Sequence, residues 1–166
     1  MKYTPKHTDN LLRAIYGSLI VASFVLMGFG TGLVRTILMS LSVVFLAVGL
    51  FLFIRHEITT YSYIVMENGD RLDFYVDKLT GKRGAYVCYY PMTDALTIEK
   101  YENGIRKKLE KKYGKTFVYR YCHNIFCGEK YLVVFQNNGY CDAVLCQLEA
   151  SHAEYIKKAI PQSEEE

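Results

Sequence analysis

Two apolar segments near the N-terminus constrain the fold of this chain more than any other feature. They are "AIYGSLIVASFVLMGFG" (14–30) and "TILMSLSVVFLAVGLFLFI" (36–54), and neither contains an acidic residue. As helices rising about 1.5 Å per residue, they would span roughly 25 and 28 Å, close to the bilayer core of about 30 Å. Neither segment shows the polar stripe of a surface helix in a soluble protein. Both therefore favour membrane-spanning helices.

The sequence between these segments, "GFGTG" (28–32), contains glycines that break a helix and permit a tight turn. We therefore predict a transmembrane helical hairpin in residues 1–56, with helices at about 12–30 and 34–55. A cleaved signal peptide fits less well, because a second apolar segment follows at once and no clear cleavage site precedes it. The remaining alternative is a buried helical hairpin of a soluble protein.

Basic residues at the ends of the hairpin predict its orientation. Lys2, Lys6 and Arg13 precede the first apolar segment, and Arg55 follows the second. Only Arg35 lies by the connecting turn. The positive-inside rule then places both termini in the cytoplasm of a plasma-membrane protein. All five cysteines follow the hairpin, and an odd number is typical of a reducing compartment.

Small residues recur every four positions in the first helix, at Ala14, Ser18 and Ala22. They form one face on which another helix packs closely. We expect this face to contact the second helix of the same hairpin. The alternative is contact with a second copy of the chain, which would make the protein a homo-oligomer.

After the hairpin, apolar and polar residues alternate with a period of two, which indicates β-strands. Residues 68–70 and 137–139, both Asn/Gly-rich, are strong hairpin turn signals. The predicted strands are 61–67, 71–77, 85–90, 95–101, 116–123, 130–136 and 141–148. We expect an α+β membrane protein in which the hairpin precedes a seven-stranded antiparallel barrel or sandwich, closed by a C-terminal helix.

Two further helices accompany these strands. One covers residues 103–114, and the other begins at Ser151, where Glu154 would complete a capping box. We predict that residues 57–161 form one cytoplasmic domain. Residues 162–166 end the chain as an acidic tail, which we expect to be disordered.

The order of seven strands and one C-terminal helix resembles that of pleckstrin-homology (PH) domains. The stretch 131–160 is similar to the end of bacterial PH-like domains, with a strand, an Asn/Gly turn, a strand and an amphipathic helix. The stretch 85–101 resembles their middle strand pair, and many such proteins carry two transmembrane helices directly before the domain. The helix at 103–114 departs from the family as an insertion. The resemblance implies a membrane-anchored module without enzymatic activity.

A cysteine-rich stretch, residues 121–146, is the strongest candidate for a metal or redox site. Its possible ligands are Cys122, His123, Cys127, Cys141 and Cys146. Structural zinc prefers C-x2–4-C pairs on a tight turn. Both pairs here are C-x4-C, at the limit of that range. Residues five apart on a strand point to opposite faces, so Cys141 and Cys146 would not share a metal. We interpret these cysteines as core residues, with zinc binding and redox use as the alternatives.

Other signs of catalysis are weak. Phosphate-binding loops, zinc-protease motifs and nucleophile elbows do not occur in the sequence. Asp70, Asp73 and Asp77 lie on one predicted hairpin, but alternation favours Asp73 and Asp77 as the solvated face of a half-buried strand. The net charge of +3 is too small to indicate a nucleic-acid partner. We therefore expect no cofactor, no metal and no enzymatic activity.

One feature has a plausible binding role, the basic helix at 103–114. Its cationic residues are Arg106, Lys107, Lys108, Lys111 and Lys112. Each such residue near an anionic leaflet contributes about 1 kcal/mol. This surface is either a lipid-binding or partner-binding site, for example for an acidic protein, or a solvated helix face.

The sequence thus favours a non-enzymatic, membrane-anchored binding or scaffolding module that presents a PH-like domain at the cytoplasmic face. Its expected partners are membrane lipid and, as alternatives, itself or another membrane protein. A second hypothesis is an oligomeric membrane sensor whose soluble domain binds a small ligand. A zinc or thiol enzyme is the least favoured.

Overall fold

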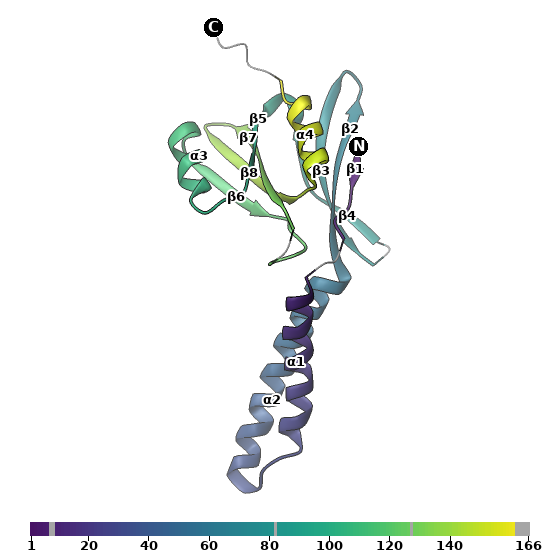
Figure 1. The fold of residues 1–166 in the computed structure, drawn as a ribbon, viewed down its shortest axis with the longest axis vertical. Coiled ribbons are helices and arrows are strands. Elements are labelled where there is room, and N and C mark those ends of the chain that lie inside the picture. The colour runs from purple at the N-terminus through teal and green to yellow at the C-terminus, as the bar shows by residue number, and fades with distance from the viewer. Residues whose placement is uncertain (7–8, 82, 127, 162–166) are drawn as a thin grey trace. The chain divides into compact units, whose positions relative to one another are not determined.

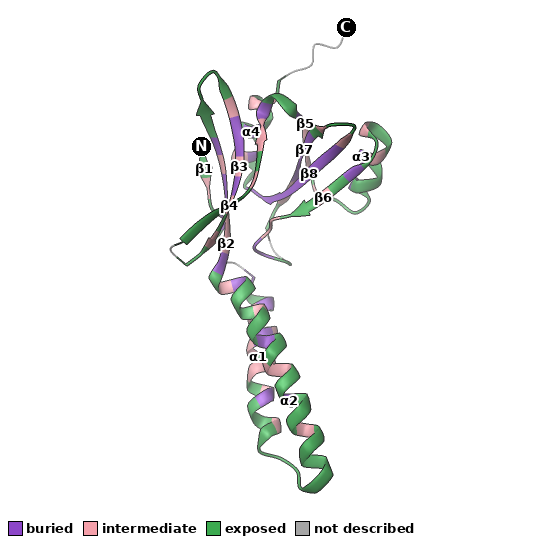
Figure 2. Ribbon diagram, turned by 180° about the vertical axis from the view of Figure 1, so that it is seen from behind, coloured by how far each residue is buried: buried purple, intermediate pink, exposed green. Residues whose placement is uncertain are grey.

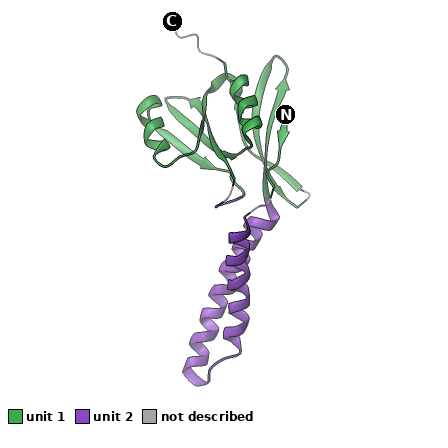
Figure 3. Ribbon diagram, viewed as in Figure 1, with its two compact units in different colours: residues 1–6, 60–123, 128–166 green, residues 7–59, 124–127 purple. Residues whose placement is uncertain are grey.

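The computed structural model describes residues 1–6, 9–81, 83–126 and 128–161. The chain divides into two compact units (Figure 3). The folded unit comprises residues 1–6, 60–123 and 128–166, and the hairpin unit comprises residues 7–59 and 124–127. The first six residues therefore belong to the folded unit, whereas the sequence-based division placed them with the hairpin.

Two long helices make up most of the hairpin unit. They are α1 (Asn10–Met27) and α2 (Gly32–Phe53), and a π-helical turn, η1 (Ile54–Ile58), follows α2. The two predicted apolar helices are confirmed, with their ends displaced by a few residues. Both helices are long and apolar enough to cross a membrane, and only 17% and 11% of their most apolar windows are buried. Figure 2 shows that exposed residues dominate both helices.

The two helices pack through a different face from the one predicted. Their buried residues are Leu12, Tyr16 and Ser23 of α1, and Ser42 and Gly49 of α2. A Cβ atom added at Gly49 would lie 2.9 Å from Cγ1 of Ile20, so the glycine permits the close approach of the helices.

Ala14 and Ser18 are exposed and Ala22 is half-buried. The expectation that they form the contact within the hairpin is therefore wrong. The larger Tyr16 contacts α2 instead, with its ring centroid 5.7 Å from that of Phe53, because burying its apolar surface contributes more than burying small side chains. Contact of the small-residue face with a second copy of the chain stays a prediction.

The first sheet of the folded unit, sheet A, has the strand order β1-β2-β3-β4 (Figure 1). Its strands are β1 (Lys2–Tyr3), β2 (Thr59–Asn68), β3 (Arg71–Thr80) and β4 (Arg83–Pro91). Strand β1 was not predicted; it pairs antiparallel with β2, with Tyr3 opposite Tyr63. The chain therefore leaves sheet A after β1, forms the hairpin, and returns to the same sheet as β2.

The second sheet, sheet B, has the order β5-β7-β8-β6. Its strands are β5 (Ala95–Lys100), β6 (Thr116–Arg120), β7 (Lys130–Asn137) and β8 (Tyr140–Gln147), and a short 3-10 helix, η2 (Met92–Asp94), precedes β5. A two-residue turn joins β7 to β8. Its residues Asn138 and Gly139 have φ of 25° and 88°, as a type I′ turn requires.

All seven predicted strands are present, and β1 is an additional one. They form two four-stranded sheets rather than one seven-stranded antiparallel structure. The antiparallel prediction is wrong for β6, which runs parallel to β8. The reason is the helix α3 (Ile105–Tyr113), which connects β5 to β6 at the opposite edge of sheet B. A helical crossover of this kind joins parallel strands.

The main core lies between the two sheets and the C-terminal helix α4 (Ala150–Ala159). Phe74 of β3 lies 5.6 Å from Phe135 of β7, measured between ring centroids, and Tyr90 of β4 stacks on Phe135 at 4.4 Å. Ile156 of α4 is fully buried against them.

The predicted capping box of α4 is wrong. The helix begins at Ala150, and its N-cap residue is Glu149, whose side chain makes no capping hydrogen bond. Ser151 is therefore inside the first turn, where its hydroxyl lies 3.4 Å from Nδ1 of His152 instead.

A buried tyrosine joins sheet A to the end of sheet B. The hydroxyl of Tyr63 is in a fully buried side chain. It accepts a hydrogen bond of 3.0 Å from the backbone N–H of Gln147 and donates one to the carbonyl of Tyr121. Removing the hydroxyl takes a hydrogen-bond partner from each of these backbone groups, and the loss is costly for the buried N–H of Gln147.

We expect Tyr63→Phe to lower the free energy of unfolding by about 1–3 kcal/mol, because it removes a hydrogen-bond partner of the buried Gln147 N–H. The control is Tyr155→Phe on α4, a tyrosine that is 44% exposed, with an expected change within about 0.5 kcal/mol. Urea unfolding in mild detergent, followed by tyrosine fluorescence, measures both. Equal stability of the two variants would contradict the structural role of this hydroxyl.

Candidate functional site

The basic helix α3 has two sides with different roles. Ile105 and Leu109 are buried against the outer face of sheet B, in a second apolar cluster with residues such as Leu132 and Ala143. The cationic side chains occupy the remaining surface of the helix. The helix is therefore an integral layer of the fold and not a separable insertion.

Arg106 and Lys108 form intramolecular ion pairs. Nε of Arg106 lies 2.9 Å from a carboxylate oxygen of Glu110, and Nζ of Lys108 lies 2.7 Å from a carboxylate oxygen of Glu99. Nζ of Lys112 lies 4.9 Å from the centroid of the Tyr113 ring.

Lys107 and Lys111 are four positions apart on the exposed side of α3. Both are exposed, and within the described part of the chain neither has an ion-pair partner. Such a pair lies on one face of a helix. These two lysines are the part of the predicted basic surface that is best placed to meet an anionic partner.

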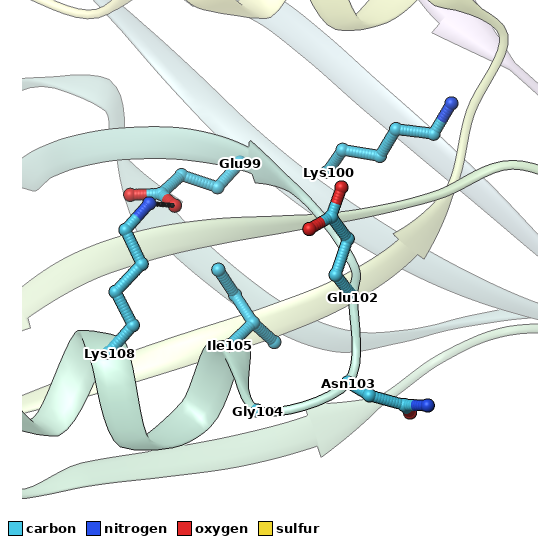
Figure 4. Close-up of a pocket in the computed structure, with 7 residues that line it drawn as sticks. All are labelled: Glu99, Lys100, Glu102, Asn103, Gly104, Ile105 and Lys108. Carbon is cyan, nitrogen blue, oxygen red and sulfur yellow. Dashed lines mark hydrogen bonds and ion pairs between the residues drawn. The ribbon is translucent and has the colours of Figure 1, made fainter.

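A hollow of about 450 Å³ lies at the start of α3 (Figure 4). Its lining residues are Glu99, Lys100, Glu102, Asn103, Gly104, Ile105 and Lys108. Two carboxylates and two ammonium groups balance in charge, and Lys100 is paired at 2.6 Å with Glu129. The described lining residues include no histidine, cysteine, serine or threonine and carry no excess of either charge.

The cysteine-rich stretch does not gather into a site among the described residues. Cys141 belongs to the cluster beneath α3, whereas Cys146 belongs to the core between the sheets. The prediction that they point to opposite faces of their strand is confirmed. Cys127 lies outside the described residues. Elsewhere in the described chain, no three His, Cys, Asp or Glu side chains lie close enough to hold a metal ion.

The described thiols are poor nucleophiles in the native state. Burial raises the pKa of Cys88 and of Cys122 to about 12, and it also raises the pKa of Cys141 and Cys146. The Cys122 thiol donates to the Leu145 carbonyl at 3.3 Å. The thiolate is the reactive form, so these environments suit packing and not catalysis.

Two buried carboxylates were not recognised from the sequence. Asp73 was assigned to a solvated face, but it is fully buried. Its oxygens accept from the Asn68 amide at 2.9 Å and from the Tyr75 hydroxyl at 3.3 Å, and Nε of Arg71 lies 3.3 Å away. These neighbours cover it, which explains the wrong prediction. Asp77 of the same strand is half-buried.

The second carboxylate, Asp142 of β8, links the two sheets. It accepts hydrogen bonds from the Tyr90 hydroxyl of β4 at 3.1 Å and from the Asn137 amide at 2.9 Å. Burial, and then the nearby charge of Asp142, raise the pKa of Tyr90. The Tyr90 hydroxyl therefore stays protonated and donates its hydrogen bond to Asp142. Both carboxylates accept hydrogen bonds from tyrosine and asparagine side chains.

A polar cluster closes the open end of the hairpin, where α1 begins and α2 ends. The Glu57 carboxylate pairs with Nε of Arg13 at 2.7 Å and accepts from the Tyr16 hydroxyl at 2.7 Å. Nδ1 of the fully buried His56 lies 3.3 Å from it. From the sequence, Arg13 is expected only to set the orientation of the hairpin, and not to form an ion pair. The lone acid directly after the second apolar segment was the signal that could have identified this pair.

No protein-family model, no curated protein and no solved structure matches this chain.

We expect the native thiols to react slowly with an aromatic disulfide reagent at pH 8. With a pKa near 12, a thiol has a thiolate fraction of about one in ten thousand at that pH, against roughly a quarter for an ordinary cysteine. The measurement uses a Cys127→Ser variant, so that the described thiols alone report, before and after unfolding. Fast labelling of Cys122 in the native protein would show a reactive site.

Proposed function

We propose that the chain is a membrane-anchored, non-enzymatic binding module. Its hairpin spans the plasma membrane, and its folded unit lies at the cytoplasmic face. The observation that carries this proposal is the exposure of the hairpin's apolar side chains, among them Phe24 (63%), Leu33 (78%) and Phe51 (62%). An apolar surface of this length is costly in water and favourable in the bilayer core. This argues against a buried hairpin of a soluble protein.

The topology of sheet A supports the orientation. Strand β1 precedes α1 and strand β2 follows α2, and the two strands pair in one sheet. Both ends of the hairpin must therefore open on the same side of a membrane. The flanking Lys2, Lys6, Arg13 and Arg55 favour the cytoplasmic side.

We further propose that α3 binds anionic headgroups through Lys107 and Lys111, with the neighbouring Lys112. Their exposure on the side of α3 opposite the apolar cluster supports this role. Attraction by surface lysines is electrostatic and does not require insertion. It should weaken as salt rises, since screening acts over about 8 Å at physiological ionic strength.

We also propose that the folded unit is related to bacterial PH-like domains. The succession of β7, a two-residue Asn-Gly turn, β8 and α4 supports this relationship. The parallel strand β6 and the crossover helix α3 are departures from it.

Orientation can be tested by labelling single introduced cysteines with a membrane-impermeant maleimide. We expect Leu33→Cys, in the first turn of α2, to be labelled in intact cells. Lys107→Cys, on α3, should be labelled only after permeabilisation. Both variants are made in a Cys127→Ser background, in which the remaining thiols react little because burial raises their pKa values. Labelling of Lys107→Cys from outside would reverse the proposed orientation.

Headgroup binding can be tested with a hairpin-free protein in which a short Gly/Ser linker joins residues 1–6 to 60–161, so that β1 is retained. We expect it to float with vesicles only when they contain anionic lipid, and to dissociate as salt rises. Replacing Lys107 and Lys111 by Gln removes about 2 kcal/mol, or roughly 30-fold in partitioning.

The matched control for this experiment is Lys157→Gln with Lys158→Gln. It makes the same change of charge on two exposed lysines of α4, and should bind vesicles as the parent protein does. Circular dichroism confirms that each variant is folded. If the parent protein does not bind anionic vesicles at low salt, the proposed lipid role of α3 is wrong. The lysines would then contact an acidic protein partner or only solvent.

A further inference from the structure

A short loop between β6 and β7 belongs to the hairpin unit and not to the folded unit that flanks it in sequence. Its described residues are Asn124, Ile125 and Phe126. Asp9, the N-cap residue of α1, contacts this loop. The Asp9 carboxylate accepts from the backbone N–H of Ile125 at 3.0 Å and from that of Phe126 at 2.7 Å.

Asp9 also accepts from the backbone N–H of Leu12 at 3.3 Å, within the first turn of α1. Its side chain is fully buried. A carboxylate that accepts several backbone N–H bonds is held firmly, because hydrogen bonds to a charged acceptor are stronger than neutral ones. The backbone of the loop is therefore fixed at the level of the residue where the first apolar helix begins.

The loop presents apolar side chains at this level. Phe126 is 56% exposed and Ile125 is 39% exposed, and Leu11, on the neighbouring turn of α1, is 57% exposed. Surface loops are normally polar, and two adjacent large apolar residues at a loop tip are unfavourable in water. The apolar side chains of the loop and the first turn of α1 are therefore next to the same residue, Asp9.

We propose that Ile125 and Phe126 insert into the headgroup–acyl boundary of the bilayer that the hairpin spans, as an interfacial anchor held in place by Asp9. The proposal rests on the proposed membrane insertion of the hairpin. In that setting, the N-cap of α1 marks the cytoplasmic boundary of the apolar core. Aromatic rings are favoured at this depth. The loop gives the chain a third contact with lipid, after the two helices.

The chain contains no tryptophan, so each introduced tryptophan is a unique probe. We compare three variants of the full chain in phosphatidylcholine vesicles that carry bromine either near the headgroup or near the bilayer centre. Phe126→Trp reports the loop, Phe24→Trp reports the half of α1 remote from Asp9, and Tyr155→Trp reports an exposed aromatic of the folded unit. Bromine quenches tryptophan on contact, so the position of the effective quencher gives the depth.

We expect Phe126→Trp to show blue-shifted emission and to lose most of its intensity with shallow bromine. Phe24→Trp should respond more strongly to deep bromine, and Tyr155→Trp to neither. If Phe24→Trp is quenched while Phe126→Trp is as insensitive as Tyr155→Trp, the interfacial anchor is wrong and the spanning hairpin stands. If Phe24→Trp is itself unquenched, the proposed membrane insertion fails.

A second arm tests the role of Asp9. Adding Asp9→Ala to Phe126→Trp removes both hydrogen bonds to the loop, and quenching by shallow bromine should fall markedly. Asp9→Ala added to Phe24→Trp should leave deep quenching unchanged, which shows that the hairpin remains inserted. Undiminished quenching of the Phe126→Trp probe in the Asp9→Ala background would overturn the positioning role of Asp9.

Discussion

The pairing of β1 with β2 is the constraint on which the rest of the molecule depends. These strands are separated in sequence by the whole hairpin, yet Lys2 lies opposite Ile64 and Tyr3 opposite Tyr63. The helical hairpin is therefore a long excursion from one edge of sheet A. Its two ends are held close together by strand pairing, and by the Arg13–Glu57 ion pair where α1 meets the end of α2.

The crossover helix α3 shows how packing determines what a surface can do. Ile105 and Leu109 must face sheet B to cover its outer side, so every cation of the helix is turned toward solvent. Arg106 and Lys108 then find carboxylates within reach. Exposed pairs of this kind contribute little to stability, but they reduce the charge available to a partner. The usable positive surface is smaller than the sequence suggests.

Periodicity predicted the hairpin and seven of the strands because each is a local pattern of several residues. It missed β1, a two-residue strand whose partner lies some sixty positions away. It also gave the wrong direction for β6, because alternation reports which residues share a face and not which way a strand runs. The prediction for Asp73 was wrong for a related reason. Alternation places it on the strand face opposite the core, but the side chains of Asn68, Arg71 and Tyr75 cover it there.

The interrupted sheet also imposes an order on biosynthesis. The ribosome completes β1 first, then the two apolar helices, and only afterwards β2. The edge strand β1 therefore stays unpaired until the hairpin and β2 have been synthesised. With the hairpin in the bilayer, as we propose, a nascent chain whose helix ends lay on opposite sides of the membrane could not pair β1 with β2. Pairing of these two strands would then be possible only in chains whose hairpin had inserted with both ends on the same side.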